Sequence, residues 1–408
     1  MPNISKRALQ VPISPFRKLI AIAEEAKAKG KHIYHLNIGQ PDIKTPAEAI
    51  EKVQNTNIDI LEYSPAVGYE SYRKKMVGYY EKFDMIVQPE NIIITTGASE
   101  ATQLIFNACL NEGDEIVIPQ PYYANYNGFA HMANVSIKPI TTKIETGFAL
   151  PSPEAFEAMI GPKTKGIMIT NPNNPTGCLY DKETLLQLGE IVKKHDLFFF
   201  VDEVYREFCY DGQQFFSALN IKGIEDHVVV LDSISKRYSA CGARIGAIVT
   251  KNEEIIKAVA KYASLRLSPP GLGQILGEAL VEMDDLYLRE TKNTYDRRRQ
   301  VVFNRLQKME GVTSYLPGGA FYCFARFPIE SAEEFCKWLL EEFEYQGASL
   351  MLAPGNAFYA QDELGTDEVR IAYVLNEEKL EKAMDCLEQA LIEYRSVMEL
   401  RQATEMER

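Results

Sequence analysis

The stretches LFFFVDEVY (residues 197–205) and VVVLDSISK (residues 228–236) decide the fold of this chain. Each opens with a run of consecutive apolar residues, Leu197–Val201 and Val228–Leu231, and each run ends in polar side chains. Apolar residues at consecutive positions are typical of strands that are covered on both faces, as in parallel sheets. The two stretches therefore predict two strands of a mainly parallel sheet, with reactive side chains at their carboxyl ends.

Similar apolar runs recur on both sides of these stretches, between Asn91 and Thr250. The other predicted strands are Ile92–Thr95, Glu115–Ile118, Gly166–Thr170 and Ile245–Thr250. Apolar residues at helical spacing predict helices over Ser99–Leu110 and Lys182–His195. Strands that alternate with helices are typical of βαβ units, so the sequence predicts an α/β fold with a sheet wound by helices.

The segments outside this block have a different character. Before it, we predict helices over Ile13–Lys29 and Gly68–Phe83. After it, we predict one long charged helix over Leu276–Lys308, strands over Ala320–Phe327 and Val369–Tyr373, and helices over Ala332–Tyr345 and Glu377–Met398. We interpret this tail as a second, smaller α+β domain. The predicted division is an N-terminal arm with part of the small domain (1–45), a large domain (46–290) and a small C-terminal domain (291–408).

Composition narrows the range of partners. The 408 residues include 44 Lys and Arg against 57 Asp and Glu, a net charge of −13, so no overall positive field favours nucleic acid or anionic lipid. No apolar run reaches the roughly 18 residues of a membrane span, and we expect a cytoplasmic protein without a membrane partner. The seven cysteines form no CxxC pair and the five histidines no HExxH pattern, so we expect free thiols and no metal.

Polar side chains gather where the predicted strands end. Ligands of open parallel sheets bind beyond these carboxyl ends. The residues found there are Gly97-Ala98-Ser99, Tyr122-Tyr123, Asn171 to Gly177, Asp202 with Tyr205, and Ser233 with Lys236 and Arg244. Each has an ordinary explanation alone, as a turn, a helix cap or a surface charge.

Their conjunction indicates one kind of ligand. A helix N-terminus and an arginine suit a phosphate, an aromatic face suits a ring, and a lysine amine suits an aldehyde. A carboxylate keeps a pyridine nitrogen protonated, which makes the ring an electron sink. Pyridoxal phosphate carries all these groups. A competing dinucleotide motif at Gly271 to Gly277 is dismissed, because its third glycine falls one position late and no strand precedes it.

At this point the sequence resembles a known family over nearly its whole length, the fold-type I pyridoxal-phosphate enzymes of aminotransferase class I/II, in the branch of bacterial aspartate aminotransferases. The resemblance rests on Leu36 to Asp42, Tyr63 with Gly68, Thr96 to Ala101, Asn171 to Gly177, Val201 to Tyr205, Ser233 to Lys236, Gly242 to Gly246, Pro317 to Phe321 and Val369 to Ala372. It implies a large domain with a mainly parallel seven-stranded sheet, a smaller α+β domain, and transfer of an amino group between an L-amino acid and a 2-oxo acid, with 2-oxoglutarate as the expected acceptor.

The resemblance also implies roles for individual residues. Lys236 would bind the cofactor aldehyde and move the substrate proton, Asp202 would bind the ring nitrogen, and Tyr205 and Asn174 would bind the ring hydroxyl. Tyr123 would stack on the ring, and Ala98, Ser99, Ser233 and Arg244 would hold the phosphate. Arg370, helped by Asn174 and the Gly39 backbone, would bind the substrate carboxylate. Tyr63 would reach the phosphate of a neighbouring subunit, which implies a homodimer with shared active sites.

Several alternatives stay open. A second cation for an acidic substrate has only Arg266 and Arg17 as candidates, and Ile13 suggests an apolar lid, so the amino donor is undetermined. The same fold supports other reactions on the same cofactor, and a carbon–sulfur β-lyase is the alternative function. A non-catalytic sensor that binds the cofactor is a third interpretation.

Overall fold

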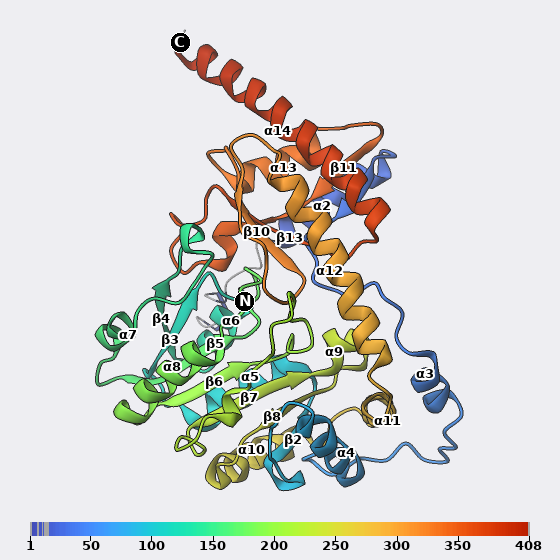
Figure 1. The fold of residues 1–408 in the computed structure, drawn as a ribbon, viewed down its shortest axis with the longest axis vertical. Helices are drawn as coiled ribbons and strands as arrows, with labels where there is room; N and C mark the ends of the chain where they lie inside the picture. Colours follow the sequence, from blue (N-terminus) through green and yellow to red (C-terminus); the bar gives the residue numbers. More distant parts are fainter. Residues whose placement is uncertain (1, 6–7, 10, 12–15, 407–408) are drawn as a thin grey trace.

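The structure is a computed structural model that describes residues 2–5, 8, 9, 11 and 16–406, and only the backbone of residues 16, 17 and 400–406. Figure 1 shows the large sheet and its helices in the lower half and a smaller group of strands and helices in the upper half. Helix α12 (Leu286–Leu306) runs along one side from the lower to the upper half. The site described below lies where the two halves meet.

The large sheet has seven strands in the order β2-β8-β7-β6-β5-β3-β4. They are β2 (Ile92–Thr95), β3 (Glu115–Gln120), β4 (Ser136–Thr141), β5 (Thr164–Thr170), β6 (Phe198–Asp202), β7 (Val228–Ser233) and β8 (Gly246–Val249). Only β8 runs antiparallel to its neighbours, so the predicted mainly parallel sheet is confirmed. The sequence analysis missed β4, because this strand at the sheet edge is only partly buried and includes Lys138 and Pro139.

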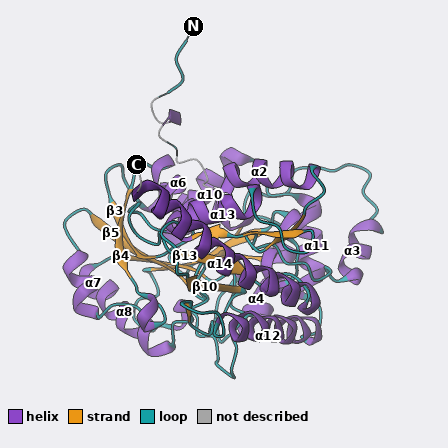
Figure 2. Cartoon of the chain, turned by 90° about the horizontal axis from the view of Figure 1, so that it is seen from above, coloured by secondary structure: helices purple, strands orange, loops and turns teal. Residues whose placement is uncertain are grey.

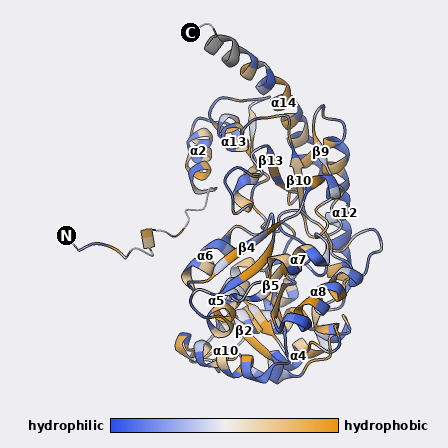
Figure 3. Cartoon of the chain, turned by 90° about the vertical axis from the view of Figure 1, so that its left-hand side faces the viewer, coloured by the Kyte–Doolittle hydropathy of each residue, from blue (hydrophilic) through white to orange (hydrophobic). Residues whose placement is uncertain are grey.

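Both faces of this sheet are covered, which explains the consecutive apolar residues in its strands. In β6, Phe199 and Val201 join the core on one face, while Phe200 joins the core on the other. Figures 2 and 3 show a layer of apolar strands between helices. One face carries α5 (Gly97–Cys109), α6 (Asn125–Met132) and α10 (Glu253–Arg266). The other carries α3 (Ala47–Gln54), α4 (Glu70–Glu81), α7 (Pro153–Met159), α8 (Lys182–His195) and α11 (Gly271–Val281).

The upper half combines both ends of the chain. Strand β1 (His32–His35) pairs in parallel with β11 (Ala348–Met351). A second sheet has the order β12-β13-β10-β9, with β9 (Thr313–Ser314), β10 (Tyr322–Arg326), β12 (Ala353–Pro354) and β13 (Glu368–Ala372). Helices α2 (Phe16–Ala28), α13 (Ala332–Glu341) and α14 (Glu377–Met406) complete this half. The division at residues 45 and 290 stays a prediction, and its second boundary falls inside α12.

The predicted single helix over Leu276–Lys308 is wrong, because two helices cover this range. Helix α11 ends at Val281 and helix α12 begins at Leu286. The helical spacing continues through the break, but acidic residues gather there. Glu282, Asp284 and Asp285 follow the carboxyl end of α11, where the helix dipole disfavours negative charge. The Asp284 side chain instead accepts the backbone N–H of Leu286 at 3.0 Å, which starts the next helix.

Three observations concern the dinucleotide motif, the cysteines and the search for metal ligands and membrane spans. The Gly271 motif opens α11 directly after Pro270 and follows no strand, so the dinucleotide interpretation stays dismissed. All seven cysteines are free. No group of His, Cys, Asp or Glu within the described part could hold a metal ion, and no described helix is long and apolar enough to cross a membrane.

Candidate active site

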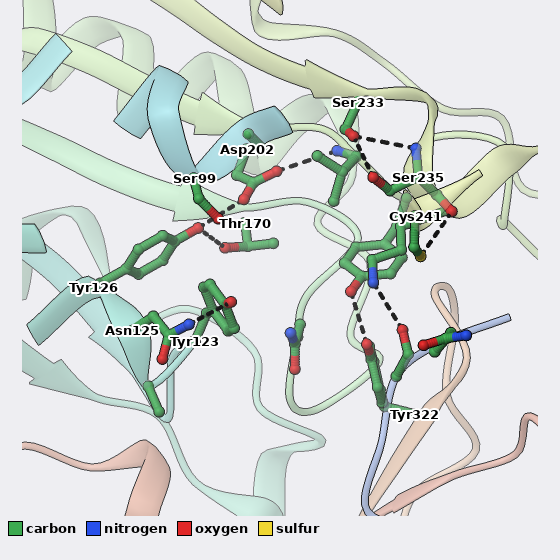
Figure 4. A pocket seen from close by; sticks show the side chains of 18 of the residues that line it. Ser99, Tyr123, Asn125, Tyr126, Thr170, Asp202, Ser233, Ser235, Cys241 and Tyr322 are labelled. Atoms are coloured by element: carbon green, nitrogen blue, oxygen red, sulfur yellow. Dashed lines mark hydrogen bonds between the residues drawn. The ribbon is translucent and has the colours of Figure 1, made fainter. Parts of the chain in front are cut away.

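A cavity of about 500 Å³ lies beyond the carboxyl ends of β5, β6 and β7 (Figure 4). All the predicted site residues except Tyr63 line it. They are Gly39, Ala98, Ser99, Tyr123, Asn174, Asp202, Tyr205, Ser233, Lys236, Arg244 and Arg370. Parallel strands deliver these side chains to one edge of the sheet, and β13 brings Arg370 from the upper half.

Lys236 lies on the short helix α9 (Ile234–Arg237), which follows β7 directly. Ser233 caps this helix, since its side chain accepts the backbone N–H of Ser235 at 3.1 Å. The Lys236 Nζ donates to the Gly39 carbonyl at 2.7 Å, so the amine is held at the cavity by the loop after β1. Among the described residues no carboxylate forms an ion pair with this amine, which lines the cavity and is available to a ligand.

Asp202 is the last residue of β6 and is only 7% exposed. Its carboxylate accepts the Tyr126 hydroxyl at 2.9 Å and the Val204 N–H at 3.2 Å. Burial raises the pKa of Asp202 to about 6. An ionised carboxylate is costly in such a place unless it meets a cation, and no described side chain forms an ion pair with it. The protonated ring nitrogen of pyridoxal phosphate is a cation that fits this need.

The opposite end of the cavity suits a phosphate. Helix α5 begins at Gly97, and its first-turn residues Ala98 and Ser99 line the cavity. A side chain at position 97 would lie 2.6 Å from the Arg244 Nη2, so the glycine makes room for this guanidinium. Within the described part of the chain, Arg244 donates to two backbone carbonyls, those of Cys241 at 2.9 Å and Thr96 at 3.4 Å, and forms no ion pair. A helix N-terminus beside a guanidinium without a carboxylate partner is a fitting anion site.

Arg370 occupies the substrate end of the cavity and is 6% exposed. Its Nη1 donates to the Asn174 Oδ1 at 2.9 Å and its Nη2 to the Asn37 carbonyl at 2.6 Å. The rings of Tyr322 and Phe358 flank it, with centroids 4.6 and 4.9 Å from the Cζ. Burial lowers the pKa of Arg370. All these contacts involve neutral groups, so the positive charge is available to a substrate carboxylate.

Several cavity residues were missed in the sequence. Tyr126 bonds to Asp202 and also contacts the Thr170 hydroxyl at 2.9 Å, and the Tyr322 hydroxyl lies 2.8 Å from that of Tyr205 (Figure 4). Tyr126 lies three residues after Tyr123, at the start of α6. This spacing is the feature of the sequence that could have identified Tyr126 as a cavity residue. Tyr123 lines the cavity and meets the Tyr126 ring edge to face, while its stacking role stays a prediction.

Two further candidates lie outside the cavity. The Tyr63 side chain is 76% exposed on the surface. Arg266 binds groups of the same chain, with Nε on Glu100 at 3.0 Å and its Nη atoms on the Ala66 and Ile94 carbonyls at 3.1 and 3.2 Å. It therefore does not supply a second cation to this cavity. Ile13 and the Arg17 side chain lie outside the described residues.

The class of protein with a lysine after β7, a buried aspartate at the end of the neighbouring strand β6, and a helix N-terminus with an arginine that suits an anion at α5 is the fold-type I pyridoxal-phosphate enzymes. Comparison with known proteins then gives the family, because the aminotransferase class I and II family matches residues 31–387. The chain belongs to this family and is a pyridoxal-phosphate-dependent aminotransferase of the aspartate aminotransferase type.

Similar proteins with several substrates support this assignment. The chain is 32% identical to an aspartate aminotransferase of Pyrococcus horikoshii, over 95% of this chain and 97% of the relative. It is 30% identical to an aromatic-amino-acid aminotransferase of Thermococcus litoralis, over 97% and 100%. A solved aspartate aminotransferase of Thermus thermophilus superposes with a TM-score of 0.87 at 27% identity, covering 96% of this chain and all of that one. The resemblance to all these enzymes leaves the amino donor open.

Proposed function

We propose that this enzyme transfers the amino group of an L-amino acid to 2-oxoglutarate in the cytoplasm, with the predicted site residues in the predicted roles. The observation that carries the proposal is the placement of Asp202, Lys236 and Arg370 around one cavity, each without a charged partner there. The relatives compared above are aminotransferases, so the β-lyase remains only as an outcome of the test.

Each residue contributes a separate step. Bound pyridoxal phosphate supplies an aldehyde and a ring that withdraws electrons. Asp202 would hold the ring nitrogen as its cationic partner, and Tyr205 and Asn174 would hold the ring hydroxyl. Arg370 would hold the substrate carboxylate with two donors, which would fix the orientation of the substrate Cα–H bond. Lys236 would act as the base that accepts the proton from the substrate Cα and then as the acid that donates it.

The test of this function is a panel of amino donors with 2-oxoglutarate as acceptor. We expect glutamate and one new 2-oxo acid in equal amounts for the preferred donors. Without the acceptor we expect no glutamate and at most one oxo acid per active site. Sulfur amino acids that release pyruvate and ammonia without any acceptor would instead establish the β-lyase.

Arg370→Lys tests the grip on the substrate. Lysine keeps the positive charge but loses the fork that reaches Asn174 and Asn37 while binding a carboxylate. We expect kcat/KM to fall about 10- to 150-fold for every donor, which corresponds to roughly 1.5–3 kcal/mol for charged hydrogen bonds. Steady-state kinetics measure this loss, and the absorbance of the bound cofactor is the control. Unchanged kcat/KM for all donors would remove Arg370 from the site.

The enzyme is proposed to act as a homodimer. Tyr63 is exposed beside other large apolar side chains from two segments, which together form an exposed apolar patch: Ile60, Leu61, Tyr63, Leu265, Leu267 and Leu272. The two segments touch, since the Ser64 hydroxyl lies 3.5 Å from the Pro269 carbonyl. A patch of this kind is typical of a protein interface, so a second copy of this chain would cover it.

Mixing two inactive variants tests the shared site. Tyr63→Ala and Lys236→Ala should each be inactive or nearly so as pure dimers. After subunit exchange, about half of the chains stand in heterodimers, and each heterodimer has one site with both residues intact. We therefore expect partial recovery of activity in the mixture, measured against unmixed samples. A fully active monomer in sedimentation would contradict the homodimer.

A further inference from the structure

Four residues of the cavity each adjoin a buried charged residue in the sequence. The adjoining pairs are Asp202 with Glu203, Tyr205 with Arg206, Ser233 with Asp232, and Lys236 with Arg237. The first member of each pair lines the cavity, whereas the second does not, and the four second members are at most 1% exposed. Together with Glu207, these four form what we call the inner charge cluster: Glu203, Arg206, Glu207, Asp232 and Arg237.

Asp232 is the centre of the inner charge cluster. Arg237 grips it with two donors, Nη1 to Oδ1 at 2.6 Å and Nη2 to Oδ2 at 3.1 Å. Arg206 approaches from the other side, with its Nη1 3.0 Å from Oδ1. The Tyr80 hydroxyl of α4 donates to Oδ2 at 2.8 Å. Asp232 therefore joins the segment after β6 to the segment after β7.

The rest of the cluster extends the same connection. The Arg206 Nη2 donates to the Glu203 Oε2 at 3.3 Å, and its Nη1 donates to the Tyr79 hydroxyl at 3.2 Å. Tyr79 in turn donates to Glu207, whose carboxylate lies 3.9 Å from the Arg237 Nε. The network thus closes a ring that runs through residues 203–207, residues 232–237 and helix α4.

The inner charge cluster holds charges of both signs inside the protein. Two guanidinium groups face three carboxyl groups. Burial raises the pKa of Glu203 to about 7 and also raises that of Glu207. Burial acts the same way on Asp232, but Arg206 and Arg237 outweigh it and hold the pKa of Asp232 well below its usual value. Asp232 is therefore the carboxyl group that both arginines favour in its charged form.

Stability alone does not account for such a cluster. Buried ion pairs recover little more than the cost of removing their charges from water, and apolar side chains of similar size often stabilise a core as well or better. What charged pairs add is direction, since two-pronged bonds fix distances and angles that apolar contacts leave free. A fixed distance matters here, because Asp202 and Lys236 must meet the same rigid ring.

We propose that the inner charge cluster positions the cofactor-binding residues. It fixes residues 202–205 against residues 233–236, so that Asp202 and Lys236 are held at the distance at which both contact one cofactor ring. The proposal rests on the roles of Asp202 and Lys236 in the proposed function. Arg237 is its principal positioning residue, because it shares helix α9 with Lys236 and holds that helix to Asp232.

The chain offers a matched control for Arg237. Arg299 is also fully buried, binds Asp211 with two donors (2.8 and 2.7 Å) and lies over a tyrosine ring. It also pairs with Asp296 (2.9 and 2.6 Å) and donates to the Pro317 carbonyl at 2.7 Å. Its Cζ lies 4.5 Å from the Tyr210 centroid, and that of Arg237 lies 4.3 Å from the Tyr79 centroid. Arg299 does not line the cavity. Arg237→Lys and Arg299→Lys therefore each remove a two-pronged bond from a buried arginine to an aspartate, one within the inner charge cluster and one outside it.

The experiment compares both variants with the wild type. Melting of the cofactor-free proteins should show similar losses of stability. Only Arg237→Lys should weaken pyridoxal phosphate binding by about tenfold and lower kcat by about 10- to 100-fold with little change in the donor KM, the scale of a small misplacement of reacting groups. Only this variant should also change the visible circular dichroism of the bound cofactor and speed amide exchange over residues 202–207 and 232–237 in the cofactor-free protein.

Tyr80→Phe is the second variant, and it replaces Arg237→Lys if the latter does not fold. It removes one hydroxyl from Asp232 and no charge, so we expect changes in the same direction, about two- to fivefold in cofactor affinity. The proposal is overturned if Arg237→Lys, or Tyr80→Phe in its place, matches Arg299→Lys in cofactor affinity, kcat and visible circular dichroism. The inner charge cluster would then have a structural role alone. Failure of the proposed function is separately visible, because the wild type itself would then not bind the cofactor or transfer amino groups.

Discussion

Lys236→Ala is expected to give a folded protein that has lost transamination by at least about four orders of magnitude. Two functions disappear together, covalent attachment of the cofactor and movement of the substrate proton, and proton transfer alone contributes about 10²- to 10⁴-fold. The fold should tolerate the change, because among the described residues the Nζ donates just to the Gly39 carbonyl at the edge of the cavity. Single-turnover kinetics and thermal melting measure the two effects.

Borohydride reduction followed by peptide mapping separates this prediction from its alternatives. Reduction should fix the cofactor to the peptide that contains Lys236 in the wild type, and to no peptide in Lys236→Ala. Lys257→Ala is the control, since this lysine is exposed and pairs only with Glu253 and Glu254 on the same helix. A cofactor label that persists on another lysine of Lys236→Ala would show that the assignment is wrong.

Much of the fold could be predicted because strands that are buried on both faces appear in the sequence as runs of apolar residues. Val228–Leu231 sends alternate side chains into two cores, so every position must be apolar, and a run of that kind is visible without any structure. Strand β4 left no such mark, since it lies at the sheet edge with its side chains partly in water. The break between α11 and α12 was missed because charged residues fit both a helix and a helix end.

The candidate site was predictable to the extent that its residues follow strands. Asp202 and Lys236 stand at the ends of apolar runs, so topology alone brings them together. Tyr126 and Tyr322 reach the cavity from a helix and from a strand of the upper half, and nothing local in the sequence shows which buried tyrosine meets which polar group. The inner charge cluster was missed for the same reason. The sequence does not show that Arg206 and Arg237 are enclosed, because Tyr79 and Tyr80 of α4 meet the cluster from a distant segment.

Asp202→Asn is expected to have opposite effects on the function and on the stability of the cofactor-free protein. Asparagine keeps the size of the side chain and removes the charge that holds the ring nitrogen protonated. We expect turnover to fall by about 10³-fold or more with the cofactor still bound, a barrier increase of roughly 4 kcal/mol. A loss smaller than about tenfold, or roughly 1.4 kcal/mol, would mean that this charge does not support catalysis.

The stability effect follows from the raised pKa of Asp202, about 6 in the folded protein against an ordinary value of 3.8. A carboxyl with a raised pKa binds its proton more tightly in the folded protein. The contribution of Asp202 to the free energy of unfolding is therefore largest at low pH and falls as the pH rises between about 4 and 6. Above that range the buried carboxylate costs the cofactor-free protein up to about 3 kcal/mol.

Cofactor-free Asp202→Asn should therefore melt above the wild type at pH 8, and the difference should shrink toward pH 4. With the cofactor bound at pH 8 the order should reverse, because only the carboxylate gains an ion pair with the ring. The same melting temperatures for both proteins at pH 8 without cofactor would show that Asp202 is not held there as a strained, unpaired charge.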